Sequence, residues 1–363
     1  MGVQQAERQR RLVKARFLSN SATVSDVAKL ANVSTATVSR ALNTPDVVRP
    51  EVRARVATAV EKLGYIPNIS AKALRQNQTR LVGVVIPTLN FALYADFFAA
   101  LQGALSQHGY FALLTTSDYD LECEAEQAAR LIRQGAQGLV LVGRQHDRKL
   151  VSMLATSRIP YVNTYVYDPL NNVRSSSVGF NNAKAIAEVV NHLAGLGHRR
   201  IAMLSGPTAN TNDRAIARVR GFVSAVAAHR MGCRDWVAEA SYSIAGGRLA
   251  MCDIFARGLE PTAVVCGSDM LAVGALEECK ARGLQVPADL SIVGFDNLEF
   301  VAHLDPPLTT VAVPSVELGR TAAEHIVALC SGEAIPQQAE LETHLVIRSS
   351  TAKAPDRKRR CRK

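Results

Sequence analysis

Apolar positions follow two different periods along this chain, and the change between them falls near residue 80. Up to Leu63, apolar residues recur every three or four positions, as in short helices that bury one face. From Leu81 onward, apolar runs of strand length alternate with longer stretches of helical period. The pattern predicts a small all-α unit followed by a larger α/β unit.

The first helix of the small unit is expected to begin after Thr23. Thr23 and Asp26 stand three residues apart, which is the spacing of a capping box. Val27 and Leu30 then form the apolar stripe that this helix is expected to bury.

A tight turn and a second helix are predicted to follow. Ser34 is the expected N-cap of this second helix, and Val38, Ala41 and Leu42 are its expected inner face. Two short helices at this spacing are typical of a helix-turn-helix, whose second helix enters the DNA major groove by its N-terminal end. A helical hairpin that only packs is the alternative. The outward positions near the start of the second helix are Thr35, Ala36, Ser39 and Arg40.

A third helix is predicted over residues 50–63. Pro50 suits its first turn, and Gly64 suits the position just past its end. The connector after it has room for a helix of barely two turns at 70–76, which is marginal in water unless it packs against something. The segments before and after this unit are addressed through their charge.

Near-continuous apolar strands separated by helices are typical of parallel sheets covered on both faces. The run is too long for one doubly wound unit, so we expect two lobes. The first lobe is expected to hold 81–163 and the chain's return after Val311, and the second to hold 177–308. The predicted strands are 81–87, 111–115, 138–142, 159–163, 201–205, 263–267 and 291–295, and the predicted helices are 96–108, 122–134, 182–195, 214–229, 269–282 and 315–331.

Charge is concentrated at the two ends of the 363-residue chain. Residues 1–80 hold 14 Lys and Arg against 5 Asp and Glu, and residues 353–363 hold 7 against 1. The middle of the chain, 81–352, holds 21 against 26 and is mildly acidic. Basic ends on an acidic body indicate a polyanion partner for the ends. The C-terminal tail either adds unspecific phosphate affinity or is an incidental solvated end.

Several functional classes find no support in the sequence. The seven cysteines form no C-x-x-C or Cys/His cluster, so we expect neither a disulfide framework nor a metal site, and a reducing cytoplasm fits. Residues 1–20 lack the apolar stretch of a secretory signal, and no apolar run is long enough for a membrane helix. The chain has no G-x-G-x-x-G after a strand, no G-x-S-x-G and no H-E-x-x-H. We therefore expect no enzyme activity and no cofactor, and His198 and His303 are interpreted as surface or loop residues.

Six sequence blocks together resemble the lactose-repressor/galactose-repressor (LacI/GalR) family of transcriptional regulators. They occur in the family's order and span most of the chain from Thr23 to about Leu345. The blocks are TVSDVAKLANVSTATVSRALN at 23–43, EKLGYIPNISAKAL at 61–74, RVRGF at 218–222, SDMLAVGAL at 268–276, SIVGFDN at 291–297 and PPLTTV at 306–311.

The resemblance implies a domain order along the chain. A helix-turn-helix DNA-binding domain (21–67) and a hinge helix (68–80) precede a two-lobed, periplasmic-binding-protein-like effector domain with parallel sheets (81–350). Residues 1–20 and 351–363 are interpreted as a disordered basic extension and a disordered basic tail. In the family the hinge helix enters the minor groove, and the resemblance maps the groove-entering residues to Ala71 and Leu74, with Leu74 as the apolar wedge.

Arg40 is the residue best suited to read a base, because a guanidinium can bond O6 and N7 of guanine together. Thr35 and Ala36 occupy the positions that choose among operators in the family. Thr37 has an alternative as an inward packing residue. The remaining polar residues are expected to bind phosphates and set the register, and they are Ser25, Ser34, Thr37, Ser39 and Asn43.

Ligands in open parallel sheets collect beyond the carboxyl ends of the strands, where Asn163 stands after a predicted strand. The resemblance assigns effector contacts to Arg218 and Asp296, and also to Tyr242 as an aromatic wall and to Ser268. Many relatives carry Asn at the place of Ser268, which leaves the hydroxyl pattern of the ligand open.

Tyr94 and Phe97, after the first strand, are candidates to line the cleft from the other lobe, with a place in the core as the alternative for Phe97. Each effector candidate has a structural alternative, such as a surface ion pair for Arg218 or a turn cap for Asp296.

These observations predict a cytoplasmic homodimer that binds a palindromic operator in double-stranded DNA. A small effector, expected to be a sugar, polyol or sugar acid, would control operator affinity, and repression is the expected outcome. The competing interpretation is a solute-binding protein that senses or carries a sugar without regulating DNA. The lack of an export signal and the presence of the first 80 residues oppose that interpretation.

Overall fold

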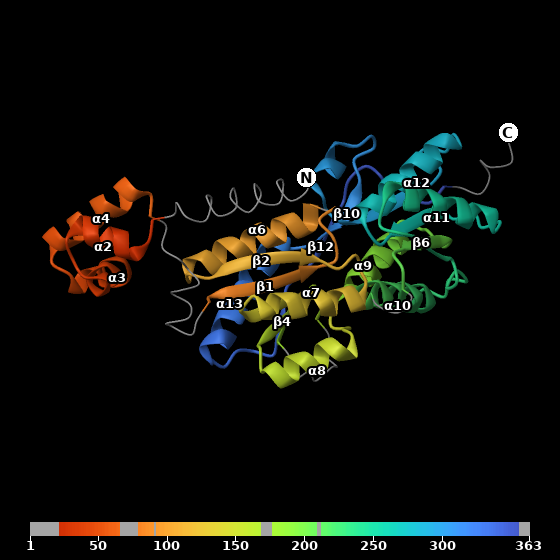
Figure 1. Ribbon diagram of the computed structural model, residues 1–363. Helices are drawn as coiled ribbons and strands as arrows, with labels where there is room; N and C mark the ends of the chain where they lie inside the picture. Colours follow the sequence, from red (N-terminus) through yellow and green to blue (C-terminus); the bar gives the residue numbers. More distant parts are fainter. Residues whose placement is uncertain (1–21, 66–78, 91, 168–175, 209–211, 356–363) are drawn as a thin grey trace, which may run out of the picture. The chain divides into compact units, whose positions relative to one another are not determined.

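The computed structural model describes residues 22–65, 79–90, 92–167, 176–208 and 212–355 (Figure 1). The chain divides into two compact units, Met1–Thr79 and Arg80–Lys363. The predictions for the N-terminal extension, for Ala71 and Leu74 in the connector, and for residues 356–363 of the tail lie outside the described residues.

The N-terminal unit is helical where it is described. The capping box at its start is confirmed, since the Thr23 backbone N–H donates to Asp26 Oδ2 at 2.9 Å and the Asp26 N–H donates to Thr23 Oγ1 at 3.3 Å. The third helix begins and ends where the sequence predicts, and Gly64 after it has a φ of 57°. The elements are α2 (Val24–Ala31), α3 (Thr35–Asn43), the 3-10 helix η1 (Pro45–Val47) and α4 (Pro50–Leu63).

The core of this unit is small and made of short side chains. The predicted inner face of α3 is buried at Val38 and Ala41, and Leu42 is half-buried. The predicted apolar stripe of α2 is wrong at Leu30, which is 51% exposed. Instead, α2 packs against α3 and α4 through alanines adjacent to Val27 in the helical turn. The buried core residues described in this unit are Val27, Ala28, Ala31, Val38, Ala41, Val56 and Ala59.

The first lobe of the large unit is a parallel six-stranded sheet in the order β11-β5-β4-β3-β1-β2. Its strands are β1 (Leu81–Ile86), β2 (Phe111–Thr116), β3 (Ala136–Val142), β4 (Tyr161–Thr164), β5 (Ser176–Gly179) and β11 (Gln338–Glu340). Helices α6 (Ala92–Gln107) and α13 (Ser315–Ser331) cover one face, and α7 (Leu121–Arg133) and α8 (Arg148–Ser157) cover the other (Figure 1).

The second lobe is a six-stranded sheet in the order β12-β10-β9-β8-β6-β7. All pairs are parallel except β10 with β12. Its strands are β6 (Ile201–Ser205), β7 (Val237–Glu239), β8 (Ala263–Cys266), β9 (Ser291–Asp296), β10 (Thr309–Ala312) and β12 (His344–Val346). Helices α9 (Asn182–Gly195) and α10 (Asp213–Ala228) pack together, as do α11 (Ile244–Ala256) and α12 (Asp269–Ala281), and the 3-10 helix η2 (Glu299–His303) follows β9.

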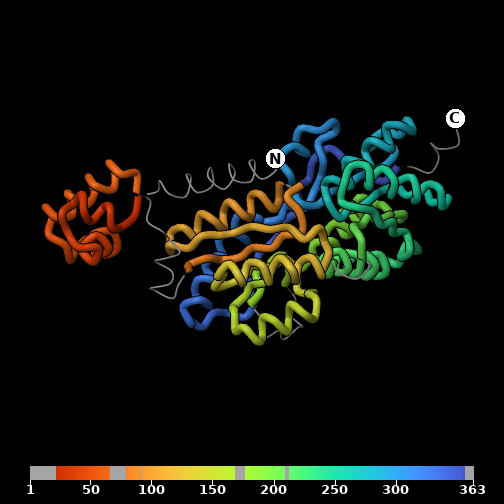
Figure 2. The backbone as a smooth tube through the Cα atoms, viewed as in Figure 1, coloured from red at the N-terminus to blue at the C-terminus, as the bar shows by residue number. Residues whose placement is uncertain are grey.

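The chain crosses between the lobes at places other than those predicted. Residues 176–179 form β5 in the sheet of the first lobe, whereas 309–312 form β10 in the second. After β11 the chain returns to the second lobe through β12, so the C-terminal segment runs through both lobes (Figure 2). The short strands at these crossings carry Ser, Thr and Gly in place of an apolar run, which is why the sequence pattern missed them.

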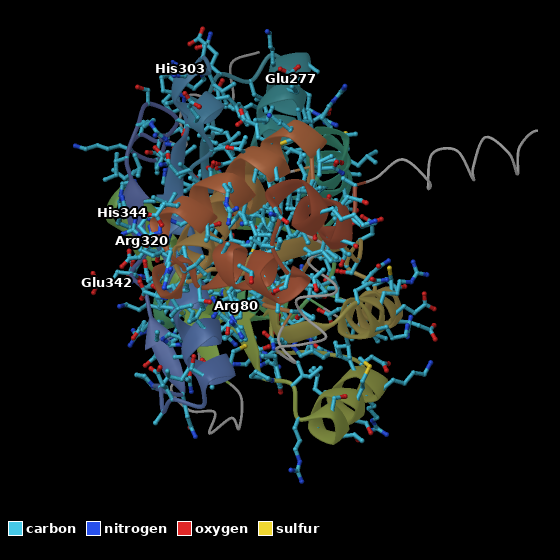
Figure 3. The ribbon with its side chains drawn as sticks, turned by 60° about the vertical axis from the view of Figure 1, so that its left-hand side comes forward. Arg80, Glu277, His303, Arg320, Glu342 and His344 are labelled. Carbon is cyan, nitrogen blue, oxygen red and sulfur yellow. The ribbon has the colours of Figure 1, made fainter. Side chains whose placement is uncertain are left out.

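The prediction for His198 is wrong, and the one for His303 is confirmed. His198 is fully buried, with Nδ1 3.0 Å from Thr262 Oγ1 and Nε2 3.0 Å from the carbonyl oxygen of Ala352. Burial lowers the pKa of His198, so a neutral ring is favoured there. His303 lies exposed at the surface, at the end of η2 (Figure 3).

No helix in the described part of the chain has both the length and the apolar content that a membrane span requires.

Candidate functional site

The start of α3 presents a polar, accessible surface. Thr35, Ala36 and Arg40 are exposed, and Ser39 is half-buried beside them. The alternating inner positions anchor the helix in the core, so these side chains face outward on a rigid element. This arrangement can present a guanidinium and small side chains to base edges.

The other polar residues predicted near DNA are partly engaged within the unit. Ser34 caps α3, because the Thr37 N–H donates to its Oγ at 3.1 Å, and the two hydroxyls are 2.9 Å apart. Asn43 Nδ2 donates to the carbonyl oxygen of Ser39 at 2.8 Å. Ser25 is exposed in the first turn of α2. Thr37 is half-buried, so phosphate contact and inward packing both remain open for it.

A cavity lies between the two lobes, at the carboxyl ends of their parallel strands. Its free volume is about 30 Å³, close to the space that one water molecule needs. Five of the six predicted effector residues line it, and the sixth, Asn163, does not. We call this the inner cavity, and its lining is Leu93, Tyr94, Tyr119, Tyr165, Asn212, Arg214, Arg218, Tyr242, Ser268 and Asp296.

Arg218 is buried on α10 and held from three sides. Its Nε donates to Asn182 Oδ1 at 2.9 Å, and its Nη1 donates to the carbonyl oxygen of Gly267 at 2.6 Å. The guanidinium carbon lies 3.8 Å from the centre of the Phe295 ring. These contacts fix the cation in one orientation, which is what a residue that orients a ligand needs.

Asp296 ends β9 in a conformation that L-residues rarely adopt, with a φ of 113°. Burial raises the pKa of its carboxyl group well above the ordinary value, and the charge of Arg218 opposes this rise. A carboxyl group whose proton is exchangeable near neutral pH can accept or donate a hydrogen bond to a hydroxyl group of a ligand.

A second carboxylate, Asp269, supports this corner from behind. It is fully buried at the start of α12 and accepts hydrogen bonds from Thr310 Oγ1 at 2.6 Å and from the Leu298 N–H at 2.8 Å. Burial raises its pKa to about 6, and these hydrogen bonds limit the rise. Asp269 therefore ties α12 to the segment that follows Asp296.

Tyr242 and Ser268 complete the side of the second lobe. The phenol of Tyr242 accepts a hydrogen bond from Asn212 Nδ2 at 3.3 Å. A Cβ at Gly206 would overlap the Tyr242 ring, so glycine leaves the ring its place. Ser268 is the N-cap of α12, where its Oγ accepts from the Leu271 N–H at 3.2 Å. Its hydroxyl is thus committed in part to the helix.

The prediction that Asn163 contacts the effector is not supported by its position. Asn163 is buried in β4, and its Oδ1 lies 3.0 Å from Nε2 of His146, whose Nδ1 lies 2.8 Å from Glu124 Oε2. Burial of His146 lowers its pKa, but the hydrogen bond and the charge of Glu124 outweigh that effect and raise it. The end of a strand therefore marked a buried network of the first lobe.

Three residues of the inner cavity were not predicted. Arg214 stands four positions before Arg218 on α10, so helical spacing was a signal that could have found it. Asn212 caps the same helix, since its Oδ1 accepts from the Ala215 N–H at 3.2 Å. Tyr119 comes from the loop after β2, and no sequence pattern marks it. At this cleft the lobes also touch directly, because the Arg144 N–H donates to Asp213 Oδ2 at 2.6 Å.

Both parts of the chain match known protein families. A profile described as "Bacterial regulatory proteins, lacI family" matches residues 23–68, and one described as "Periplasmic binding protein-like domain" matches 190–351. The "HTH-type transcriptional repressor CytR" of Escherichia coli (strain K12) is 32% identical over 347 residues, covering 94% of this chain and 100% of that protein.

Solved structures show the same architecture. A lac repressor dimer bound to operator and an anti-inducer is similar with a TM-score of 0.82 and 28% identity, covering 92% of this chain and 99% of that chain. The complex of the transcriptional regulator CelR with cellobiose has a TM-score of 0.68 and 31% identity, covering 91% and 99%.

Proposed function

Because the chain belongs to the LacI family of bacterial regulatory proteins, we propose that it represses transcription in the cytoplasm as a homodimer on a palindromic operator, under the control of a small effector. The effector that we propose is a sugar, polyol or sugar acid. The observation that carries the effector role is the inner cavity, where Arg218 and Asp296 of one lobe face Tyr94 of the other.

The proposed mechanism couples two states of the large unit. A ligand in the cleft contacts both lobes, so its binding changes the equilibrium between lobe arrangements by its differential affinity for them. In a dimer this changes the spacing of the two connectors, and with it the minor-groove contact proposed for Ala71 and Leu74. Whether the effector releases the operator or promotes its binding is a property of that differential affinity.

Operator preference is the first test of this function. Fluorescence anisotropy of the full chain at physiological salt should show binding to one palindromic duplex that is at least about 1,000-fold tighter than binding to a shuffled duplex. The palindrome would come from selection of random duplexes. Equal affinity for all duplexes, with and without sugars and polyols, would contradict the function.

Arg40→Ala is expected to weaken operator binding by about 1–3 kcal/mol at one symmetric base position. The exposed guanidinium on α3 would lose a bidentate bond to guanine, so the loss should vanish on an operator mutated at that base pair. Arg53→Ala, an exposed arginine on α4, is the matched control and should leave base preference unchanged. An equal loss on every sequence would make Arg40 a phosphate contact.

The edge strand β2 is our candidate for part of the homodimer surface. Phe111 and Leu113 alternate along it and are 61% and 43% exposed, so both project from the same face of an edge strand. Apolar side chains gathered on an edge are typical of an association surface.

The double variant Phe111→Lys with Leu113→Lys is expected to raise the dimer dissociation constant at least about tenfold, and to weaken operator binding with it. Sedimentation velocity measures the first effect. Val151→Lys, a change at a 49% exposed site on α8, should leave the dimer intact. An unchanged dimer in the double variant would place the interface elsewhere.

A further inference from the structure

A second and larger space opens next to the inner cavity. It measures about 290 Å³, and we call it the outer cavity. Tyr119, Asn212 and Tyr242 line both cavities. Because these three residues form a shared wall, the two cavities are neighbouring compartments of one cleft between the lobes.

The outer cavity has a lining suited to an uncharged, hydroxyl-rich group. Thr88 and Ser241 offer hydroxyls, Asn90 offers an amide, and Asp118 offers a carboxylate. Among the described residues that line it, none is basic. Hydroxyl groups of a ligand can donate to and accept from such a set, whereas a phosphate or carboxylate would meet no positive charge.

Tyr119 and Tyr242 separate the two compartments. Tyr119 follows β2 of the first lobe, and Tyr242 follows β7 of the second, with ring centres 5.6 Å apart and planes tilted by 35°. Asp118 and Tyr119 have φ values of 49° and 63°. Two successive left-handed residues cost on the order of 1 kcal/mol each, so the loop is held in a form that presents Tyr119 to the opposite lobe.

The inner cavity is closed by this pair. About 30 Å³ of free space cannot hold a ring, so the two tyrosines must separate when a ligand ring enters. Flat aromatic faces on either side of the passage can then pack on the apolar faces of a ring or of a linkage.

We propose, on the basis of the effector role given to the cleft, that the effector consists of two linked, uncharged units. One unit binds in the inner cavity beside Arg218 and Asp296, and the second, hydroxyl-rich unit binds in the outer cavity. The linkage passes between Tyr119 and Tyr242. Disaccharides and nucleosides share this chemistry, and the experiment separates them.

Isothermal titration of the full chain would use maltose and cellobiose as disaccharides, adenosine and uridine as nucleosides, and glucose and ribose as single units. At least one two-unit probe should bind at least about tenfold more tightly than its sugar unit. Asn90→Tyr fills the outer cavity from an exposed loop position, and it should abolish this advantage while leaving the affinity for the single unit. Ala155→Tyr, on the exposed side of α8, is the matched control and should preserve the advantage.

Three results would overturn the inference. They are a single unit that binds as tightly as every two-unit probe, an equal loss for both kinds of probe in Asn90→Tyr, and no binding of any two-unit probe. Operator binding measured on the same samples distinguishes the two levels. If operator preference persists in any of these cases, the DNA-binding function stands and the two-unit effector is wrong.

Discussion

Val38→Asp is expected to abolish operator binding while leaving effector binding unchanged. Val38 is fully buried on α3 at the centre of a core made largely of alanine and valine. An unpaired carboxylate there costs at least about 3 kcal/mol, and a helical unit of this size has little stability to lose. The large unit has its own core, so the loss should stay within the N-terminal unit.

Circular dichroism and heteronuclear NMR of the full chain would follow the folding of each unit, and anisotropy would follow operator binding. Leu30→Asp makes the same kind of change at a 51% exposed site on α2 and should leave the unit folded. Operator binding retained by Val38→Asp would mean that α3 is not the DNA-binding element.

Arg218→Met is expected to weaken effector binding at least about 100-fold and to lower the free energy of unfolding by about 3 kcal/mol. The variant leaves Asn182 Oδ1 and the Gly267 carbonyl oxygen without their donor, and it removes the cation over Phe295. Loss of this charge should also raise the pKa of Asp296 further, because Arg218 is the charge that lowers it.

Arg218→Lys separates charge from geometry. Lysine keeps the cation but not the planar fork, so the pKa of Asp296 should change less than in Arg218→Met while effector affinity is still reduced. Titration calorimetry and thermal unfolding give the two affinities and stabilities. Effector affinity unchanged in Arg218→Met would reduce Arg218 to a structural residue of α10.

Local chemistry made the N-terminal unit largely predictable from sequence. A capping box at Thr23, Pro50 in the first turn and Gly64 after the last turn each act over a few residues, so the observed helix bounds follow from them. Leu30 was misplaced because burial depends on where α3 and α4 lie, and small alanines pack more closely against them.

The large unit was predictable where strands are apolar and helices are periodic. It was not predictable at β5 and β10, where the chain changes lobes, or at His198, which is buried by the returning C-terminal segment. Such contacts join residues far apart in sequence, and periodicity carries no information about them.

The candidate site shows the same division. Arg218 and Asp296 stand in recognisable motifs, and the structure brings them to one cavity. Tyr119 and the outer cavity depend on how two lobes face each other across loops, which no local pattern encodes. Asn163 shows the reverse error, since a polar residue at the end of a strand met a buried histidine in place of a ligand.

The account rests on coupling between the cleft and the helix-turn-helix unit, and one titration tests it most directly. Operator affinity of the full chain would be measured by anisotropy at increasing concentrations of a ligand shown by calorimetry to bind the cleft and to lose affinity in Arg218→Met. We expect operator affinity to change by about 5-fold to 150-fold, with the same factor in ligand affinity when operator is present. Operator affinity that stays constant at saturating ligand would contradict the account.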